Sequence, residues 1–485
     1  MSVSPVYTPD PRFEALGFEF ADPVDPADFP QSIARHWNDR WAAEIGLEGL
    51  SAEERTAHFH RFDPLPDNQA RPLALRYHGH QFRTYNPEIG DGRGFLFGQV
   101  RDRSNRLLDF GTKGSGRTPY SRSGDGRLTL KGAVREVLAA ELLEARGVYT
   151  SKIFAVYETG EALHRGDEPS PTRSAVMTRL SHSHVRIGMF QRHAFFERAD
   201  LIEQLADYAL REFYPHRDAD TPGARAANLL DEACKASARL AAQWMAAGFV
   251  HGVLNTDNLV VTGESFDYGP WRFLPAFEPG FTAAYFDHSG LYAYARQPEA
   301  VFWALQQFAG ALSLVADRGA LIEALEAYPG YYRDAVREAF LARLGLEGLD
   351  ADSDGDFVTA LLDWMKESGV AWEGLFHDWF CGAASAERAL AGPRAAFYRD
   401  PAFAEVRAAI EARAPARPER LGHPVFQREE PVHMVIEDVE ALWAKIAEED
   451  DWSAYEAALA DIAETRRAYD LGRGPEGLKP GFLEG

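Results

Sequence analysis

The hydrophobic and polar positions divide this chain into a strand-rich part and a longer helical part. Between residues 72 and 181, short apolar runs alternate with polar residues and glycines, a pattern typical of β-strands joined by tight turns. The strands predicted by this pattern lie at residues 94–100, 107–113, 151–157 and 174–180. One helix is expected among them, over residues 131–146, because Val134, Val137 and Leu138 follow helical spacing.

After residue 190 the apolar positions follow helical spacing almost throughout. The helices expected there lie at residues 192–214, 224–247 and 298–315, with several more up to about residue 470. The segment 1–70 is rich in proline and aspartate, and one helix is predicted over residues 31–45. We therefore predict an α+β, protein-kinase-like two-lobed fold, with a small β-rich N-lobe and a larger helical C-lobe.

This layout predicts four regions along the chain. They are an N-terminal extension (residues 1–71), a kinase-like N-lobe (72–190), a helical C-lobe with a catalytic loop at 251–269 (191–471) and a flexible tail (472–485). Glycine and proline are frequent in the tail, and such terminal segments rarely form regular structure.

The charge balance and the cysteine count exclude several classes of protein. The net charge is −23, whereas binding to nucleic acid or to an anionic membrane requires a basic surface. Only two cysteines occur, which excludes a disulfide scaffold. The sequence shows no signal peptide and no 18-residue apolar run. We expect a cytoplasmic enzyme without a nucleic-acid or membrane partner.

The segment from His251 to residue 269 is similar to the catalytic loop of protein kinases, which reads H-R-D-L-x-x-x-N and is followed by D-F-G. His251 and Asn258 have the required spacing, and Asp267 begins a D-Y-G sequence. The position of the kinase base is occupied by Val253, and the nearest acidic residue is Asp257. This pattern predicts that nucleotide and metal are bound, but it does not predict ordinary phosphoryl transfer.

A glycine-rich turn precedes the predicted hairpin and contains Gly90, Gly92 and Arg93. Glycines allow backbone N–H groups to approach phosphates closely, although a plain turn between strands would have the same composition. Lys113 ends the hairpin, and Glu136 follows on the predicted helix 23 residues later. In kinases such a lysine binds phosphates and is held by a glutamate of the next helix, so we favour the nucleotide-binding interpretation.

Two arginines, Arg179 and Arg186, flank the junction between the two predicted lobes. Arginines bind phosphate oxygens well, so this position favours a phosphate clamp over a solvated surface pair. Three other patterns are interpreted as structural. They are a Walker-like run at residues 111–118, the histidine pairs at 78/80 and 182/184, and an acidic run at residues 350–355 that begins like an EF-hand. We interpret the acidic run as a solvated loop that caps a helix starting near residue 357.

Together these segments resemble the selenoprotein O family, protein adenylyltransferases with a pseudokinase fold. The resemblance extends from about residue 72 to residue 320, with weaker similarity beyond and a poor match over segment 1–70. The segments that carry it are GHQF at 79–82, GDGR at 90–93, KGSGRTPYSRSGDGR at 113–127, SHVRIG at 183–188, HGVLNTDN at 251–258, DYGP at 267–270, FDH at 286–288 and YAYARQP at 292–298.

The resemblance implies an ATP bound in reverse relative to kinases, and transfer of AMP to Ser, Thr or Tyr hydroxyls of acceptor proteins with release of pyrophosphate. It also implies Mg²⁺, with UTP and Mn²⁺ open as alternatives. The residues that it assigns to the nucleotide are Gly90, Gly92, Arg93, Lys113, Asp125, Gly126, Glu136, Arg179, Arg186 and Asp267. In addition, Asn258 and Asp267 would bind the metal, and Asp257 would accept the proton.

Members of that family commonly carry a redox-active cysteine or selenocysteine near the C-terminus. The sequence GLKPGFLEG at residues 477–485 has neither, so redox control through the tail is not expected. Two other functions compete with adenylyl transfer. One is an atypical kinase that transfers the γ-phosphate, and the other is an inactive pseudokinase that binds ATP as a scaffold.

Overall fold

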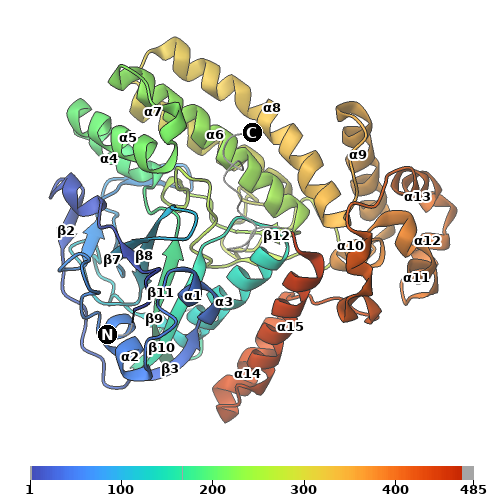
Figure 1. Cartoon of the computed structure of the whole chain (residues 1–485), viewed down its shortest axis with the longest axis horizontal. Coiled ribbons are helices and arrows are strands. Elements are labelled where there is room, and N and C mark those ends of the chain that lie inside the picture. Colours follow the sequence, from blue (N-terminus) through green and yellow to red (C-terminus); the bar gives the residue numbers. More distant parts are fainter. Residues whose placement is uncertain (1–2, 167, 472–485) are drawn as a thin grey trace.

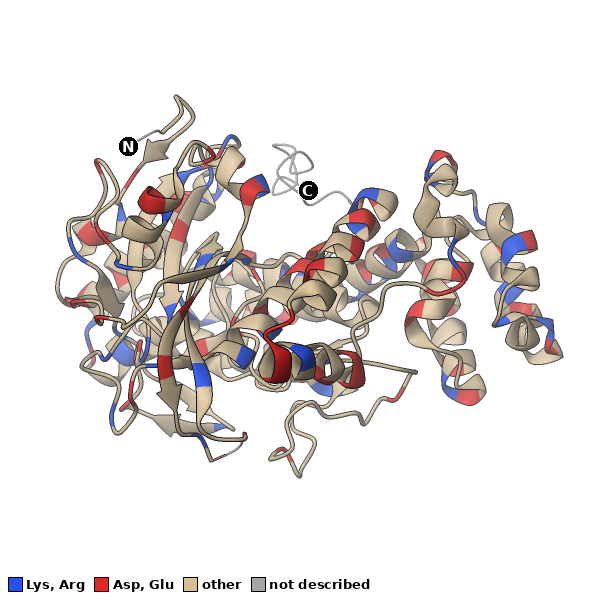
Figure 2. Cartoon of the chain, turned by 90° about the horizontal axis from the view of Figure 1, so that it is seen from below, with Lys and Arg blue, Asp and Glu red and all other residues tan. Residues whose placement is uncertain are grey.

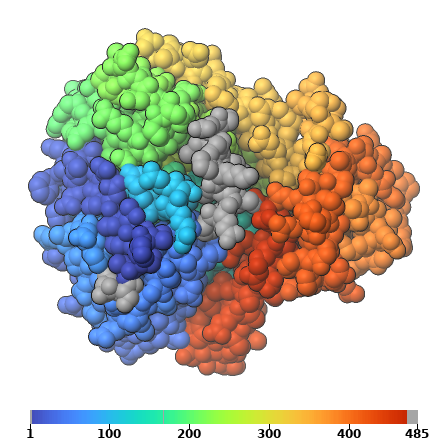
Figure 3. Space-filling model, in the orientation of Figure 1, coloured from blue at the N-terminus to red at the C-terminus, as the bar shows by residue number. Residues whose placement is uncertain are grey.

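The structure is a computed structural model that describes residues 3–166 and 168–471. The predicted tail at 472–485 therefore lies outside the described residues. The chain forms a mixed α/β fold, with one large sheet and many helices (Figure 1). In Figure 3 the blue N-terminal residues and the orange residues of the late helices lie on different sides of the molecule. Figure 2 shows acidic and basic residues interspersed over both parts.

The sheet has nine strands, and every pair of neighbours is antiparallel. Its main path runs β2-β4-β7-β8-β11-β10-β3, with β1 beside β7 and β9 beside β11. Its strands are β1 (Thr8–Pro9), β2 (Ala21–Pro23), β3 (Ile33–Trp37), β4 (Leu73–Leu75), β7 (Leu96–Arg101), β8 (Leu107–Lys113), β9 (Leu128–Thr129), β10 (Lys152–Leu163) and β11 (Thr172–Ser181). Two small hairpins pair β5 (Gly79–Gln81) with β6 (Thr84–Asn86) and β12 (Phe249–Val250) with β13 (Arg272–Phe273). The four strands and the hairpin predicted between residues 94 and 180 are confirmed.

Helix α3 (Leu130–Ala145) confirms the helix predicted within the strand-rich part. It begins where the Thr129 side chain accepts a hydrogen bond from the N–H of Gly132, 3.1 Å away. Its apolar stripe is buried and belongs to the main hydrophobic core. Glu136 and Glu144 are also buried, and because they are eight residues apart they point to the same side of α3.

The predicted N-terminal extension contributes strands to the sheet. β1, β2 and β3 pair with β7, β4 and β10, so this extension shares the main sheet with residues 72–190. The helix predicted over residues 31–45 is wrong in its first half, where Ile33–Trp37 is strand β3. Tertiary pairing with β10 determines the conformation there. Only α1 (Asp39–Glu44) is helical, and Asn38 caps it by accepting a hydrogen bond from Trp41 N–H.

The helical part begins with α4 (Ile187–Phe195) and α5 (Ala199–Phe213), which replace the single helix predicted over residues 192–214. Glu197 adopts a left-handed backbone conformation (φ 53°), which separates the two helices. The long helices α6 (Pro222–Ala246) and α8 (Arg318–Leu344) pack against each other in the core, with α7 (Gln297–Leu312) beside them. The helices around and after them are α2 (Ala52–Phe59), α4 (Ile187–Phe195), α5 (Ala199–Phe213), α6 (Pro222–Ala246), α7 (Gln297–Leu312), α8 (Arg318–Leu344), α9 (Ala351–Ser368), α10 (Trp372–Asp378), α11 (Ala386–Ala391), α12 (Ala395–Arg399), α13 (Ala404–Glu411), α14 (Ile436–Glu449) and α15 (Ser453–Tyr469). Among the helices described, none has the length and apolar character needed to cross a bilayer.

The acidic run at residues 350–355 is the start of α9, so its interpretation as a loop was wrong. Asp350 caps the helix by accepting hydrogen bonds from the N–H groups of Asp352 and Ser353. Asp354 is buried and forms an ion pair with Arg413 at 2.8 Å. The carboxylates are therefore used in capping and pairing, which supports the rejection of a calcium loop.

Candidate active site

The predicted catalytic loop lies between β12 and β13, whose pairing brings its two ends together. Within it, residues Thr256–Asn258 form a single turn of 3₁₀ helix. His251 is buried, its Nε2 lies 3.0 Å from the Phe266 carbonyl oxygen, and its N–H donates to Gln297 Oε1 at 2.9 Å. His251 therefore holds the two halves of the loop together and fixes them to α7.

A buried charged cluster forms where β8, α3 and the catalytic loop meet. The Lys113 ammonium group forms an ion pair with Glu136 and lies 2.6 Å from Asp267 Oδ1. Arg179 Nη1 lies 3.6 Å from the same Asp267 oxygen and 3.9 Å from Glu136. Asn258 Nδ2 donates a hydrogen bond to Asp267 Oδ2 at 3.0 Å. Five of the residues singled out from the sequence are thus in direct contact.

Asp267 remains ionised in this cluster. Burial alone would raise the pKa of its carboxyl group, but Lys113, Arg179 and Arg186 hold that pKa well below its usual range. Its backbone is left-handed, with φ at 64°, a conformation that aspartate adopts more readily than most residues other than glycine. The surrounding cations therefore fix both the charge and the position of this carboxylate.

Arg186 connects the catalytic loop to the glycine-rich turn. Its Nη1 donates a hydrogen bond to the Asp257 carbonyl oxygen at 2.8 Å, and its Nη2 lies 3.4 Å from Asp91 Oδ1. Burial raises the pKa of the Asp257 carboxyl group to about 6, although Arg186 lowers it in part. Asp91 was missed from the sequence, although it stands between Gly90 and Gly92.

A cleft of about 700 Å³ opens beside Asp257. Among the predicted residues, Gly90, Gly92, Arg93, Asp125, Gly126 and Asp257 line it. A Cβ atom would clash at all three glycines among these positions. It would lie 2.5 Å from the Tyr120 ring on Gly90, 2.9 Å from the Tyr120 carbonyl oxygen on Gly92, and 2.2 Å from the Gly116 carbonyl oxygen on Gly126 (φ 71°). The two glycine-rich loops therefore pack closely and form one wall.

The other predicted residues do not line this cleft. They form the buried cluster around Asp267, which connects to the cleft through Arg186 and Asp257. Asp125 lies in the cleft wall, and its carboxylate pairs with Arg165 at 2.8 Å. The cleft residues that sequence reasoning missed include Arg122, Arg127 and Arg165. The first two lie in the run quoted at 113–127, whereas no motif marks Arg165.

A buried oxygen beside Asp267 fits a bound cation. Asn258 Oδ1 is buried and has no hydrogen-bond partner among the described residues, while Asn258 Nδ2 holds Asp267 Oδ2 at 3.0 Å. Unpaired acceptor oxygens at such a position are costly unless a ligand satisfies them. No group of three or more His, Cys, Asp or Glu side chains suited to a metal occurs in the described part of the chain. A cation here would therefore take further oxygens from a nucleotide, as Mg²⁺ commonly does.

The histidines near the site have structural partners, as predicted. His78 bonds to Tyr85 at 2.9 Å, and His80 bonds to Gln191 at 2.8 Å. His182 contacts the Tyr149 hydroxyl at 2.6 Å. His184 contacts the buried Asp109 at 3.2 Å. The Walker-like run is also structural, because β8 ends at residue 113 and a non-helical loop follows.

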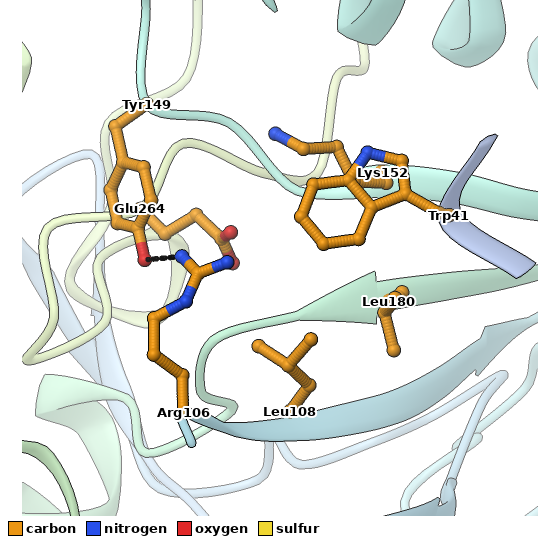
Figure 4. A pocket seen from close by; sticks show the side chains of 7 residues that line it. All are labelled: Trp41, Arg106, Leu108, Tyr149, Lys152, Leu180 and Glu264. Carbon is orange, nitrogen blue, oxygen red and sulfur yellow. Dashed lines mark hydrogen bonds between the residues drawn. The ribbon is translucent and has the colours of Figure 1, made fainter. Parts of the chain in front are cut away.

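A second buried charged cluster lies against the same face of α3. Lys152, at the start of β10, lies 3.4 Å from Glu144 Oε1 and 5.4 Å from the centre of the Trp41 ring. The cavity beside it measures about 10 Å³, room for about one water molecule. Figure 4 shows its lining, which consists of Trp41, Arg106, Leu108, Tyr149, Lys152, Leu180 and Glu264.

Glu264 belongs to this second cluster and lies three residues before Asp267. Its Oε2 accepts a hydrogen bond from the N–H of His182 at 2.8 Å, and Figure 4 shows its side chain beside that of Arg106. Burial raises the pKa of the Glu264 carboxyl group to about 7, against the effect of Lys152. This cluster is enclosed, whereas the cluster around Asp267 adjoins the open cleft.

Comparison with known proteins identifies a family of transferases. The family model described as "Protein adenylyltransferase SelO" matches residues 6–463. The chain belongs to the SelO family. The match begins at residue 6 and so includes most of segment 1–70, where we had expected poor similarity.

Similar proteins cover most of the chain. The protein nucleotidyltransferase YdiU of Trichodesmium erythraeum is 48% identical over 383 residues, which are 76% of this chain and 78% of the relative. Its counterpart in Gloeobacter violaceus is 42% identical over 457 residues, which are 92% and 93% of the two chains. That of Chromobacterium violaceum is 37% identical over 356 residues, or 72% and 73%.

Proposed function

We propose that this protein transfers AMP from ATP to Ser, Thr or Tyr hydroxyls of other proteins and releases pyrophosphate. The observation that carries the proposal is the contact of Lys113 with both Glu136 and Asp267, where Asp267 follows a loop in which Val253 occupies the position of a kinase base. Membership of the SelO family supports nucleotidyl transfer over phosphoryl transfer.

The proposed reaction is a displacement at the α-phosphorus. The acceptor oxygen forms a bond to this phosphorus, the bond from phosphorus to the α–β bridging oxygen breaks, and pyrophosphate leaves with the electron pair. The hydroxyl proton passes to the Asp257 carboxylate, which is half-buried and borders the cleft. General-base assistance of this kind typically contributes about 10²–10⁴-fold to the rate.

The charged cluster would bind the phosphates and the metal. Arg179 Nε and Nη1 and Arg186 Nε are buried donors without a hydrogen-bond partner in the described chain, and they suit phosphate oxygens. Asn258 and Asp267 would hold Mg²⁺, or Mn²⁺ as an alternative. When bound, such a cation neutralises phosphate charge and orients the leaving group.

We also propose that the arrangement is the two-lobed one of protein kinases. The lysine that ends a strand, its glutamate on the following helix and the aspartate after the catalytic loop meet in one cluster, as they do in kinases. In this proposal residues 72–190 form the N-lobe and residues 191–471 form the C-lobe.

Labelled nucleotide tests the proposed reaction. The protein is incubated with a protein mixture, Mg²⁺ and ATP labelled at either the α- or the γ-phosphate, and labelled proteins are separated on a gel. We expect label on protein only from the α position. Label from the γ position alone would identify a kinase, and no label from either position, with ATP binding intact, would identify a scaffold. Labelled UTP with Mn²⁺ tests the alternative nucleotide.

A further inference from the structure

The hairpin of β5 and β6 ends in a turn of unusual composition. Phe82 and Arg83 form the turn, and both have left-handed backbone conformations, with φ at 50° and 62°. Two-residue hairpin turns of this kind favour glycine and asparagine, because a side chain makes positive φ unfavourable. A bulky phenylalanine persists there only if surrounding contacts hold it.

Those contacts come from the catalytic loop. The N–H of Phe82 donates to Asn255 Oδ1 at 3.0 Å, and the N–H of His80 donates to Thr256 Oγ1 at 2.8 Å. Asn255 Oδ1 also accepts a hydrogen bond from the Tyr292 hydroxyl at 2.9 Å. The turn is therefore tied to the two residues that directly precede Asp257.

Three aromatic side chains are exposed beside this turn, and we call Phe82, Tyr285 and Phe286 the aromatic patch. Their exposed fractions are 37%, 78% and 43%. Phe286 contacts both others, with ring centres 5.8 Å from Phe82 and 5.1 Å from Tyr285. Clustered exposed aromatic residues are typical of surfaces that bind another protein.

The segment that carries Tyr285 and Phe286 is held in place by Asp287. Its carboxylate accepts hydrogen bonds from the N–H groups of Leu291 at 2.9 Å and Tyr292 at 2.8 Å. Both sides of the aromatic patch are therefore anchored before any partner binds. Pre-organisation of this kind reduces the entropy lost on binding.

The aromatic patch continues into the proposed active site. Gln81 directly precedes Phe82, and it lines the same cleft as Asp257. At the patch, Arg83 pairs with Glu299 at 3.0 Å, so its charge is already compensated. The aromatic patch therefore offers apolar contact, whereas the adjoining cleft beside Asp257 is lined by arginines.

Resting on the proposed function, we infer that the aromatic patch binds the acceptor protein. It holds a large apolar side chain next to the Ser, Thr or Tyr that receives AMP, in an extended segment whose hydroxyl reaches Asp257 through the cleft. The acceptors are thus selected by an apolar residue flanking the modified hydroxyl.

A peptide library tests this inference. Each peptide carries one Ser, Thr or Tyr, with flanking positions occupied either by Leu and Phe or by Gly, Ala and Asp, and α-labelled ATP supplies the label. We expect the wild-type protein to label peptides with apolar flanks preferentially. The double variant Tyr285→Ser/Phe286→Ser should raise KM for these peptides by about tenfold, with kcat and ATP affinity nearly unchanged.

Two further variants separate recognition from general damage. Phe18→Ser removes an aromatic ring of similar exposure, 74%, outside the aromatic patch, and it should retain the wild-type preference. Tyr285→Phe should also retain it, because the ring remains.

Equal labelling of all peptides, or an unchanged preference in the double variant, would overturn the inference while leaving adenylyl transfer intact. Label on a folded-protein mixture but on no peptide would also overturn it. Absence of α-label from every acceptor, with ATP bound, would instead overturn the proposed function and this inference with it.

Discussion

Two buried lysine–glutamate pairs lie on the same side of α3 and differ in the space that they adjoin. The pairs are Lys113 with Glu136 and Lys152 with Glu144, and in each the lysine comes from a strand and the glutamate from α3. The first pair adjoins Asp267 and, through Arg186 and Asp257, an open cleft of about 700 Å³. The second borders a closed cavity of about 10 Å³.

The comparison shows that residue types alone do not distinguish the pair proposed to act in catalysis from a structural one. Both lysines are buried and both have carboxylate partners. The cluster around Lys113 connects to the open cleft through Arg186 and Asp257, whereas Trp41, Leu108 and Leu180 line the small cavity beside Lys152. We therefore expect substitutions near Lys113 to change activity and those near Lys152 to change stability.

The largest effect is expected for Asp267→Ala. This substitution removes the carboxylate that is proposed to hold the cation, so turnover should be abolished and Mg²⁺-dependent ATP binding weakened. Initial rates with α-labelled ATP and calorimetric titration measure the two quantities. Glu264→Gln is the matched control, because it changes a buried carboxylate three residues away in the closed cluster. Near-normal turnover in Asp267→Ala would remove Asp267 from the proposed site.

Asp257→Ala tests whether Asp257 acts in the chemical step or in nucleotide binding. If Asp257 is the base, kcat should fall by about 10²–10⁴-fold while the affinity for ATP–Mg²⁺ stays within a few-fold. Lys113→Ala should instead weaken nucleotide binding itself, because its ammonium group is proposed to contact phosphate. Calorimetric titration of both variants, beside their turnover numbers, decides between these roles. Parallel losses of affinity in the two variants would contradict the assignment of Asp257.

Lys152→Ala tests the closed cluster. Removing one partner leaves Glu144 buried without this lysine, and broken buried pairs typically cost about 3–5 kcal/mol of unfolding free energy. Arg40 and Arg466 also contact Glu144 and should reduce the loss. Denaturant unfolding measures the stability, and rates per folded molecule should remain close to wild type. A stable but inactive Lys152→Ala variant would contradict the distinction between the clusters.

The smallest effect concerns pH. Burial raises the pKa of the Glu264 carboxyl group from 4.5 to about 7. The folded protein therefore holds this proton more tightly than the unfolded chain, and the resulting stabilisation is complete below about pH 4.5. This stabilisation is lost as the pH rises through about 7. Relative to Glu264→Gln, the wild-type protein should lose about 1.4 kcal/mol of unfolding free energy per pH unit between about pH 5 and pH 7. Urea unfolding at several pH values measures the difference, and a constant difference would contradict the pKa shift.

The parts of the site that the sequence predicted are those that lie in contiguous motifs. Lys113, Asn258 and Asp267 could be found because their spacing is set within single loops and strands. Arg165 could not, because it reaches the cleft only through the fold and pairs there with Asp125. The elements from residue 94 to residue 180 were predicted for a similar reason, since each alternating apolar run buries one strand locally.

Strand β3 shows why the remainder of the fold could not be predicted. Its conformation depends on pairing with β10, in which Trp37 lies opposite Ala155, far along the chain. The residues near β3 in the sequence do not indicate which distant strand it will pair with. The break between α4 and α5 was missed for another reason, because it rests on the positive φ of Glu197, a residue type that rarely adopts that conformation.

The positions of β2 and β3 have a consequence for fragments of this protein. These two strands occupy opposite ends of the main path of the sheet, and both precede helix α1 in the chain. A fragment that starts at residue 72 would therefore leave β4 and β10 with uncovered edges, which are templates for pairing between molecules. Such a fragment should aggregate rather than yield an isolated nucleotide-binding unit. During synthesis, strand β3 likewise cannot pair until β10 has been made.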